Sequence, residues 1–304
     1  MSVEAVDREP IAMRDKRLIS PKLIDRAANL GLWLAGLAIL GILAAFLAYI
    51  LYKGLPVLSW NFVTGMSSDI KAGGGVGPQL FNSFYILFLS MAFSLPVAVG
   101  AGIYLAEFAG RSKLTDLIRL STESLATVPS IVLGLFGMII FVNTLGLGFS
   151  IIGGALTLSL LNIPVLVRVT EEAIKTVPDQ YREASLALGA TKWQTIRRVV
   201  LPTALPGIIT GLTLTAGRAL GESAILIFTA GTTVSRQLPD PNLLAAGETL
   251  AVHMWYVMAV GLVPDRIDIA NGSGALLIIT ILIFNLVFTI PGRLLQRKLS
   301  GSDS

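Results

Sequence analysis

The sequence predicts an all-α integral membrane protein with six transmembrane helices. Of the 304 residues, 54% are hydrophobic and only 14% are charged. The apolar residues occur in runs long enough to cross the hydrocarbon core of a bilayer as helices, which takes about 20 residues each. The Lys and Arg residues gather in alternate segments between these runs, as expected when basic residues are retained on the cytoplasmic side.

The expected transmembrane helices follow one another along the chain. Residues 1–26 are interpreted as a cytoplasmic tail, and residues 77–295 as a single transmembrane core that follows the first helix. The predicted helices cover residues 27–52, 80–106, 121–142, 149–169, 204–231 and 274–290.

Charge predicts the orientation of these helices. If the N-terminus is inside, most basic residues fall in cytoplasmic segments, and both termini are cytoplasmic. The only basic residues in the segments predicted to be outside are Lys53, Lys71, Arg236 and Arg266.

One further stretch, Leu243–Val263, is also long enough to span. Glu248 and His253 interrupt it, and a seventh span would place the basic C-terminus outside. We therefore interpret it as a re-entrant or interfacial helix on the outer face, with His253 as an interfacial side chain.

Composition excludes several classes of function. The chain has no Cys and a single His, so we expect no disulfide framework, thiol nucleophile, metal site or bound cofactor. The formal charge of +4 indicates no nucleic-acid partner, because the basic residues are sorted by membrane side. The glycine run at 73–75 lacks the Lys-Ser/Thr ending of a phosphate-binding loop and is interpreted as a flexible turn.

The longest polar interval, residues 171–206, predicts a helical elbow between two spans. Pro178 and Asp179 suit the first turn of a helix, where a missing N–H is harmless and a carboxylate meets the positive dipole end. Gly189 can adopt the left-handed conformation that ends a helix. The elbow is therefore expected to contain a first short amphipathic helix over about 178–188.

A second short helix is expected directly after this turn. Thr191 with Gln194 three residues later predicts a capping box. An apolar stripe at helical spacing follows, formed by Trp193, Ile196 and Val200. Leu201-Pro202 is expected to close this helix. Two stiff helices on the cytoplasmic side suit docking onto another protein.

The elbow also carries a family resemblance. The run Glu183-Ala184-Ser185, then Gly189, Val199 and Leu201-Pro202, resembles the EAA signature of ABC-importer permeases. It departs from that signature at two positions: Ser185 replaces the usual second Ala, and Val199 replaces the usual Ile. The resemblance implies a type I (MetI-like) bundle whose cytoplasmic coupling helices seat in a separate ATPase subunit. The residues that it implies for ATPase coupling are Glu183, Ala184, Ser185, Gly189, Leu201 and Pro202.

Arg218 and Glu222 are candidates for the translocation site. A charge within a membrane helix costs about 2.5–3.5 kcal/mol even on the lenient insertion scale, so both should face protein or water. On a continuous helix they share one side with Gly207 and Gly211, a pair that permits close helix approach. Arg218 would offer an anion a planar fork, and Glu222 would hold that fork. Alternatively, the two charges form a structural pair that only orients helices.

Three further motifs are similar to those of phosphate-specific permeases. They are Leu125–Gly137, Asn162–Arg168 and Arg218–Ala224. The last motif resembles that of PstA-type subunits, although Thr and Pro are more usual near Ser223 and Ile225. The sister PstC-type subunit is therefore kept as an alternative.

This resemblance implies a non-enzymatic permease of the bacterial plasma membrane that imports inorganic phosphate. Its implied partners are an ABC ATPase dimer, a PstC-type sister permease and an extracytoplasmic phosphate-binding protein.

Other functions remain possible from the residues alone. Arg218 would serve any tetrahedral oxyanion, so molybdate or sulfate are alternative cargoes. An ion-coupled secondary transporter could use Arg218 and Glu222 as a proton-linked pair, and a membrane scaffold or sensor would need neither. The elbow argues against a secondary transporter, because such a protein has no ATPase to dock.

Overall fold

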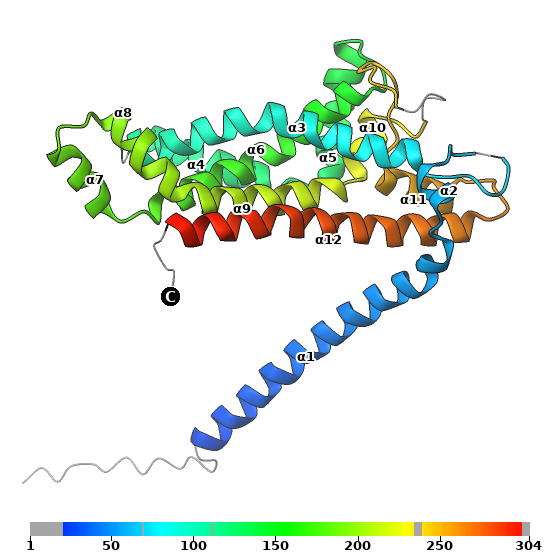
Figure 1. The fold of residues 1–304 in the computed structure, drawn as a ribbon, viewed down its shortest axis with the longest axis horizontal. Helices are drawn as coiled ribbons and strands as arrows, with labels where there is room; N and C mark the ends of the chain where they lie inside the picture. Colours follow the sequence, from blue (N-terminus) through cyan, green and yellow to red (C-terminus); the bar gives the residue numbers. More distant parts are fainter. Residues whose placement is uncertain (1–20, 69, 111, 234–238, 300–304) are drawn as a thin grey trace, which may run out of the picture. The chain divides into compact units, whose positions relative to one another are not determined.

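The computed structural model describes residues 21–68, 70–110, 112–233 and 239–299, which form helices joined by turns and loops and contain no strand (Figure 1). Five helices are long and apolar enough to cross a membrane, and a bent pair adds a sixth if it is counted as one span. The predicted all-α membrane class is therefore confirmed.

The helical elements are α1 (Pro21–Gly54), η1 (Leu55–Val57), α2 (Trp60–Thr64), α3 (Gly77–Ile103), η2 (Tyr104–Phe108), α4 (Lys113–Ala126), α5 (Ser130–Gly137), η3 (Met138–Thr144), α6 (Ile151–Lys175), α7 (Asp179–Ala187), α8 (Lys192–Thr195), η4 (Ile196–Val200), α9 (Leu201–Leu220), α10 (Ala224–Thr229), α11 (Leu250–Ala259) and α12 (Arg266–Leu299). Three of them, η2, η3 and η4, are π-helical turns that continue an adjacent α-helix.

The chain divides into two units, Met1–Tyr49 and Ile50–Ser304. Residues 1–20 of the predicted tail lie outside the described residues. In the first unit, α1 exposes apolar side chains such as Leu32 and Trp33, 72% and 69% exposed. Such a surface is suited to hydrocarbon. The second unit contains every other helix.

The third predicted span, 121–142, is broken rather than continuous. It consists of α4 followed by α5 and η3, bent by 97° between the two parts. Helix α4 begins before the predicted span, at Lys113, and the Ser112 hydroxyl caps it by accepting a 3.2 Å hydrogen bond from Thr115 N. Pro129 precedes α5 and has no N–H with which to continue α4.

The fifth predicted span, 204–231, differs at both ends. Helix runs from α8 through η4 into α9, so Pro202 does not close the second elbow helix as predicted. Pro202 follows the π-helical turn, where the hydrogen-bond pattern changes, and its missing N–H is tolerated there. The span ends at Leu220, and the chain turns at Gly221 before α10 begins.

The stretch Leu243–Val263 contains only α11, a helix of ten residues. A helix of this length is too short to cross a bilayer. The expectation that this stretch is not a seventh span is therefore confirmed. The last span is longer than predicted, because α12 already begins at Arg266.

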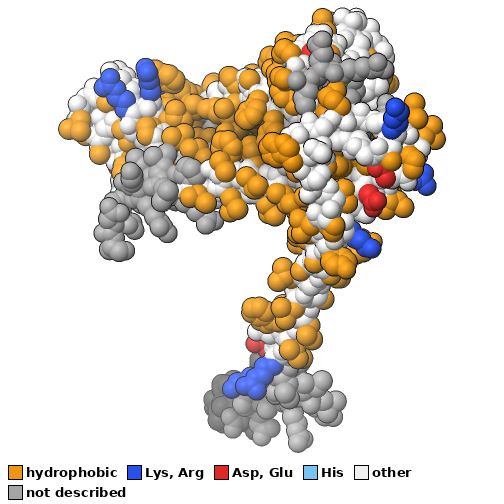
Figure 2. Space-filling view, turned by 45° about the vertical axis from the view of Figure 1, so that its right-hand side comes forward, with side chains coloured by type: hydrophobic (Ala, Val, Ile, Leu, Met, Phe, Trp, Pro, Cys, Tyr) orange, Lys and Arg blue, Asp and Glu red, His pale blue; other side chains and the backbone are white. Residues whose placement is uncertain are grey.

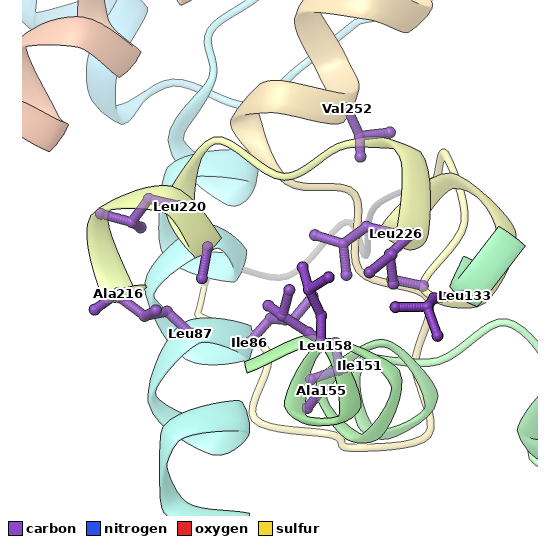
Figure 3. Close-up of a cluster of buried hydrophobic side chains, with 14 of the residues drawn as sticks. Ile86, Leu87, Leu133, Ile151, Ala155, Leu158, Ala216, Leu220, Leu226 and Val252 are labelled. Atoms are coloured by element: carbon purple, nitrogen blue, oxygen red, sulfur yellow. The ribbon is translucent and has the colours of Figure 1, made fainter. Parts of the chain in front are cut away.

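The main hydrophobic core lies where α3, α6, α9 and α10 meet (Figure 3). Ile86 and Leu87 of α3 pack against Leu158 of α6, and Leu220 and Leu226 close the cluster from the α9–α10 side. Because lipid is as apolar as these side chains, the core is held mainly by close contact rather than by removal of water.

Glycines make this close contact possible at the helix crossings. A Cβ on Gly102 would lie 2.6 Å from Thr170 Cβ, where α3 crosses α6. A Cβ on Gly211 would overlap Val169, where α9 crosses α6. The predicted role of Gly207 and Gly211 in close helix approach is therefore confirmed, with α6 as the neighbour.

Candidate functional site

The elbow, residues 171–206, lies at one end of the second unit, where α7 and α8 project beyond the long helices (Figure 1). Its turns form as predicted. Gly189 has a φ of +83°, the left-handed conformation that suits glycine. The Thr191 hydroxyl accepts a 3.3 Å bond from Gln194 N, and Gln194 Oε1 accepts a 2.8 Å bond from Thr191 N, which completes the capping box.

The elbow carries an open groove of about 470 Å³ between its two helices. Its lining residues are Gln180, Tyr181, Ala184, Ser185, Leu188 and Val199. Leu188 is 90% exposed. Of the predicted apolar stripe, Trp193 is 57% exposed, whereas Ile196 and Val200 are buried. Exposed apolar side chains around a groove are typical of a surface that binds another protein, a membrane or a ligand.

Two residues of the predicted coupling motif, Ala184 and Ser185, line this groove. Glu183 and Ala184 are exposed, whereas the hydroxyl of Ser185 lies 2.9 Å from that of Thr195 and joins α7 to α8. Leu201 is part of the first turn of α9. The structure thus brings the motif residues of α7 and the start of α9 to one end of the molecule.

Arg182 is a structural centre of the elbow that the sequence reasoning missed. Its guanidinium donates to Glu107 Oε1 through Nη2 and Nε, at 2.8 and 3.0 Å. The same group donates to the carbonyls of Ile174 and Val177, at 3.0 and 2.6 Å, and to Asp179 Oδ1, at 3.1 Å. No local pattern predicts this contact, because Glu107 precedes Arg182 by 75 residues.

Lys192 holds the same part of the chain from the second elbow helix. Its Nζ donates to the carbonyl of Glu107 and lies 4.6 Å from the centre of the Phe108 ring. Both residues belong to η2, which continues α3 at the end of the bundle nearest the elbow; this end is called the inner end below, after the predicted orientation. The two elbow helices therefore each contribute a cation to the end of α3.

A second ion-pair cluster lies between α4 and α6 beside the elbow. Arg119 Nε donates to Glu171 Oε1 at 3.0 Å, and Lys175 contacts the same oxygen. Arg168 pairs with Glu172 at 2.9 Å. These residues line a cavity of about 190 Å³, in which acidic and basic side chains balance one another.

The two predicted translocation residues are separated in the structure. Arg218 is exposed on α9, and no hydrogen bond or ion pair joins it to Glu222 among the described residues. Glu222 lies past the end of α9, where its Oε1 accepts a 3.4 Å bond from Ile225 N at the start of α10. The predicted pairing is wrong, because it assumed a helix that continues through Gly221.

Arg218 belongs to a face of α9 that the described residues of the second unit leave uncovered. Thr203, Thr210, Leu214 and Gly221 share this face at helical spacing and are exposed. Figure 2 shows broad hydrophobic surface over the bundle, with Lys and Arg side chains at the elbow end. A single cation on such a face is positioned to meet a partner helix or a passing anion.

A buried polar cluster lies at the end of the bundle away from the elbow. His253 Nδ1 is 2.9 Å from Glu248 Oε2, and Gln79 Nε2 donates to the same oxygen at 2.9 Å. His253 is only 4% exposed, so the expectation of an interfacial side chain is wrong. The described residues contain no group of three or more His, Cys, Asp or Glu that could hold a metal ion.

A bundle of membrane-length helices with an exposed, grooved elbow at one end defines the class of protein: a multi-pass membrane subunit built to work with a docked partner. The chain belongs to the family of binding-protein-dependent transport system inner membrane components, whose family model matches residues 98–301.

Two curated relatives support this membership. The chain is 46% identical over 291 residues to the probable ABC transporter permease protein YqgI of Bacillus subtilis (strain 168), covering 92% of this chain and 99% of that protein. It is 35% identical over 237 residues to the phosphate transport system permease protein PstA of Haemophilus influenzae, covering 78% and 82%. The resemblance to PstA-type permeases is confirmed.

A solved structure confirms the fold. The MetNI methionine ABC transporter in an inward-facing conformation has a chain that matches with a TM-score of 0.57 at 22% identity, covering 73% of this chain and 94% of that one. The MetI-like bundle predicted from the elbow is therefore confirmed.

Proposed function

We propose that this chain is the permease subunit of an ATP-driven importer that carries inorganic phosphate across the bacterial plasma membrane. The observation that carries the proposal is the exposed groove of the elbow, at the end of a bundle of membrane-length helices. The relationship to PstA of Haemophilus influenzae supports phosphate as the cargo. The fold does not select a cargo, because the structural match belongs to a methionine transporter.

Under this proposal the chain is not an enzyme, and a separate ATPase dimer hydrolyses ATP. One ATPase subunit seats its own apolar surface in the groove beside Tyr181 and Leu188. Glu183, exposed and outside the groove lining, is free to pair with a cation of that subunit. Such a contact combines an apolar centre with a polar rim, which is the usual anatomy of a protein interface.

The translocation path is assigned to the uncovered face of α9. A PstC-type sister permease covers this face in the assembled importer, and Arg218 projects into the space between the two subunits. The guanidinium offers two parallel N–H donors to the oxygens of phosphate. Glu222, now placed in the turn after α9, contributes at the outer end of the same path. An extracytoplasmic phosphate-binding protein delivers the anion on the side opposite the elbow.

Uptake of labelled anions tests the cargo. Cells that lack this chain should lose uptake of phosphate and regain it when the chain is restored, while uptake of labelled sulfate and molybdate stays the same. Loss of molybdate or sulfate uptake with normal phosphate uptake would replace phosphate by that oxyanion. Normal uptake of all three would contradict the importer function.

A further inference from the structure

One guanidinium joins three separate elements at the inner end of the bundle. Arg182 belongs to α7, Glu107 to η2 at the end of α3, and Ile174 and Val177 to the end of α6 and the turn after it. The Glu107 side chain is 8% exposed, and that of Arg182 is 19% exposed. A buried carboxylate needs a partner of opposite charge, so this contact is strongly favoured once the elbow is in place.

The geometry requires arginine at this position. The carbonyl of Ile174 lies in the last turn of α6 and that of Val177 in the turn after it, where carbonyls lose the partners that a continuing helix would supply. The forked guanidinium satisfies both carbonyls and the carboxylate of Glu107 at the same time. A lysine has one compact ammonium group and cannot hold three acceptors in these directions.

Lys192 adds a second attachment from the other elbow helix. It binds the backbone carbonyl of Glu107 and lies over the ring of Phe108. The inner end of α3 is therefore held between α7 and α8. This end is π-helical, with Ala109 N bonded to Tyr104 O at 2.8 Å, and its wider turn presents Glu107 to the elbow.

We propose that Arg182, assisted by Lys192, makes the elbow and the inner end of α3 one rigid body, so that a displacement of the elbow is passed directly to α3. Arg182 is thus a positioning residue that acts through Glu107. The inference rests on the proposed function in assigning the source of the displacement to a docked ATPase. It adds which membrane helix receives that displacement and through which side chains.

Spin labels test the rigid body directly. Because the chain has no Cys, single cysteines can be introduced at Gly100 of α3, which has open space around it, and at Leu186 of α7, which is half exposed. In the assembled transporter with wild-type Arg182, the distance between the labels should be the same without nucleotide and with ATP trapped. In Arg182→Gln the distance should shift or broaden when ATP is trapped.

Two outcomes of this experiment overturn the proposal. One is a label distance that changes with nucleotide when Arg182 is intact. The other is an unchanged distance in Arg182→Gln. Neither depends on the identity of the cargo, so this test is separate from that of phosphate import, which fails if the wild-type complex takes up no phosphate into vesicles.

Transport measurements then show whether the attachment matters for coupling. Glu107→Gln and Arg182→Gln should retain the ATPase subunit and its hydrolysis, but import far less phosphate per ATP. A decrease of up to about 100-fold is expected when distant groups are displaced by about 1 Å. Arg182→Lys should fall in between. Unchanged coupling, or loss of the ATPase subunit from all three variants, contradicts the proposal.

Asp179, another partner of the Arg182 guanidinium, provides a matched control. Asp179 also accepts a hydrogen bond from Arg182 but is 87% exposed and belongs to the same helix. Asp179→Asn therefore removes a partner of Arg182 without detaching α7 from α3. Its coupling should equal that of the wild type, and a loss as large as in Glu107→Gln would show that the attachment to α3 is not the cause.

Discussion

Arg218 is exposed two residues before α9 ends, on a face that the described residues of the second unit leave uncovered. If it contacts the passing anion, Arg218→Lys should insert and assemble normally, because the charge is kept. It should transport poorly, because an ammonium lacks the bidentate fork. Loss of one charge-assisted hydrogen bond, worth about 1.5–3 kcal/mol, corresponds to roughly a 10- to 150-fold decrease in phosphate uptake.

Two further variants of this chain supply the control for Arg218→Lys and the result that would contradict a role of Arg218 in the path. Arg197→Lys changes another exposed arginine, on the elbow, and should leave uptake unchanged. The double variant Arg218→Leu, Glu222→Leu should assemble but remain inactive. Near-normal uptake by the double variant would rule out a role of Arg218 in the path, and would favour a scaffold function.

Local interactions of single residues could be predicted from the sequence, and distant ones could not. The left-handed Gly189 and the Thr191–Gln194 capping box depend on neighbours within three residues. The contact of Arg182 with Glu107 depends on a residue 75 positions away, and that of Glu248 with Gln79 on one 169 positions away. The type and spacing of residues contain no information on such pairs.

At the level of the elements, the turn between α7 and α8 allows a prediction for docking. Gly189 has open space around its Cα, so a side chain there would meet no neighbour, and only the positive φ opposes it. Gly189→Val should cost about 1–2 kcal/mol or more in this conformation and misalign the two elbow helices. We expect a membrane-inserted chain that loses its ATPase partner during purification.

Gly189→Asn is the matched variant, because asparagine tolerates the left-handed region. It should retain the ATPase partner and most of the transport activity. If Gly189→Val also retains both, the relative orientation of the elbow helices is not what the partner recognises.

The breaks within spans were not predicted, although their physical causes are local. The apolar pattern continues through Pro129 and through Gly221, so hydropathy alone joins α4 to α5 and α9 to α10. Pro129 removes an N–H, and Gly221 has no side chain to hold the helix against its neighbours. Whether such a residue bends or breaks a helix is decided by packing, which the sequence pattern does not show.

For the whole molecule, the orientation in the membrane is a prediction that reporter fusions can check. Fusions after Lys71 and Arg266 should report an outside location. Fusions after Lys113, Lys192 and Lys298 should report the cytoplasm, because most basic residues belong to these segments. A fusion after Lys298 that reports outside would contradict two cytoplasmic termini and would require a further crossing.

The class of the molecule was predictable, because the length of apolar runs and the distribution of Lys and Arg are constraints that the bilayer imposes on every spanning chain. The family was predictable because its motif lies within one short stretch around Glu183. The uncovered face of α9 was not, since a helical projection cannot tell which side a neighbouring helix covers.

The cations of the ion pairs at the elbow end of the bundle also bear on how the chain inserts into the membrane. During synthesis, Lys and Arg are retained on the cytoplasmic side, while Asp and Glu contribute little to that choice. The predicted orientation places Arg119, Lys175 and Arg182 on the cytoplasmic side, where they would orient their spans before any tertiary contact exists. Once the helices assemble, the same cations are bound by Glu171 and Glu107. Each of these cations thus serves first as a topology signal during membrane insertion and afterwards as one partner of an ion pair in the folded protein.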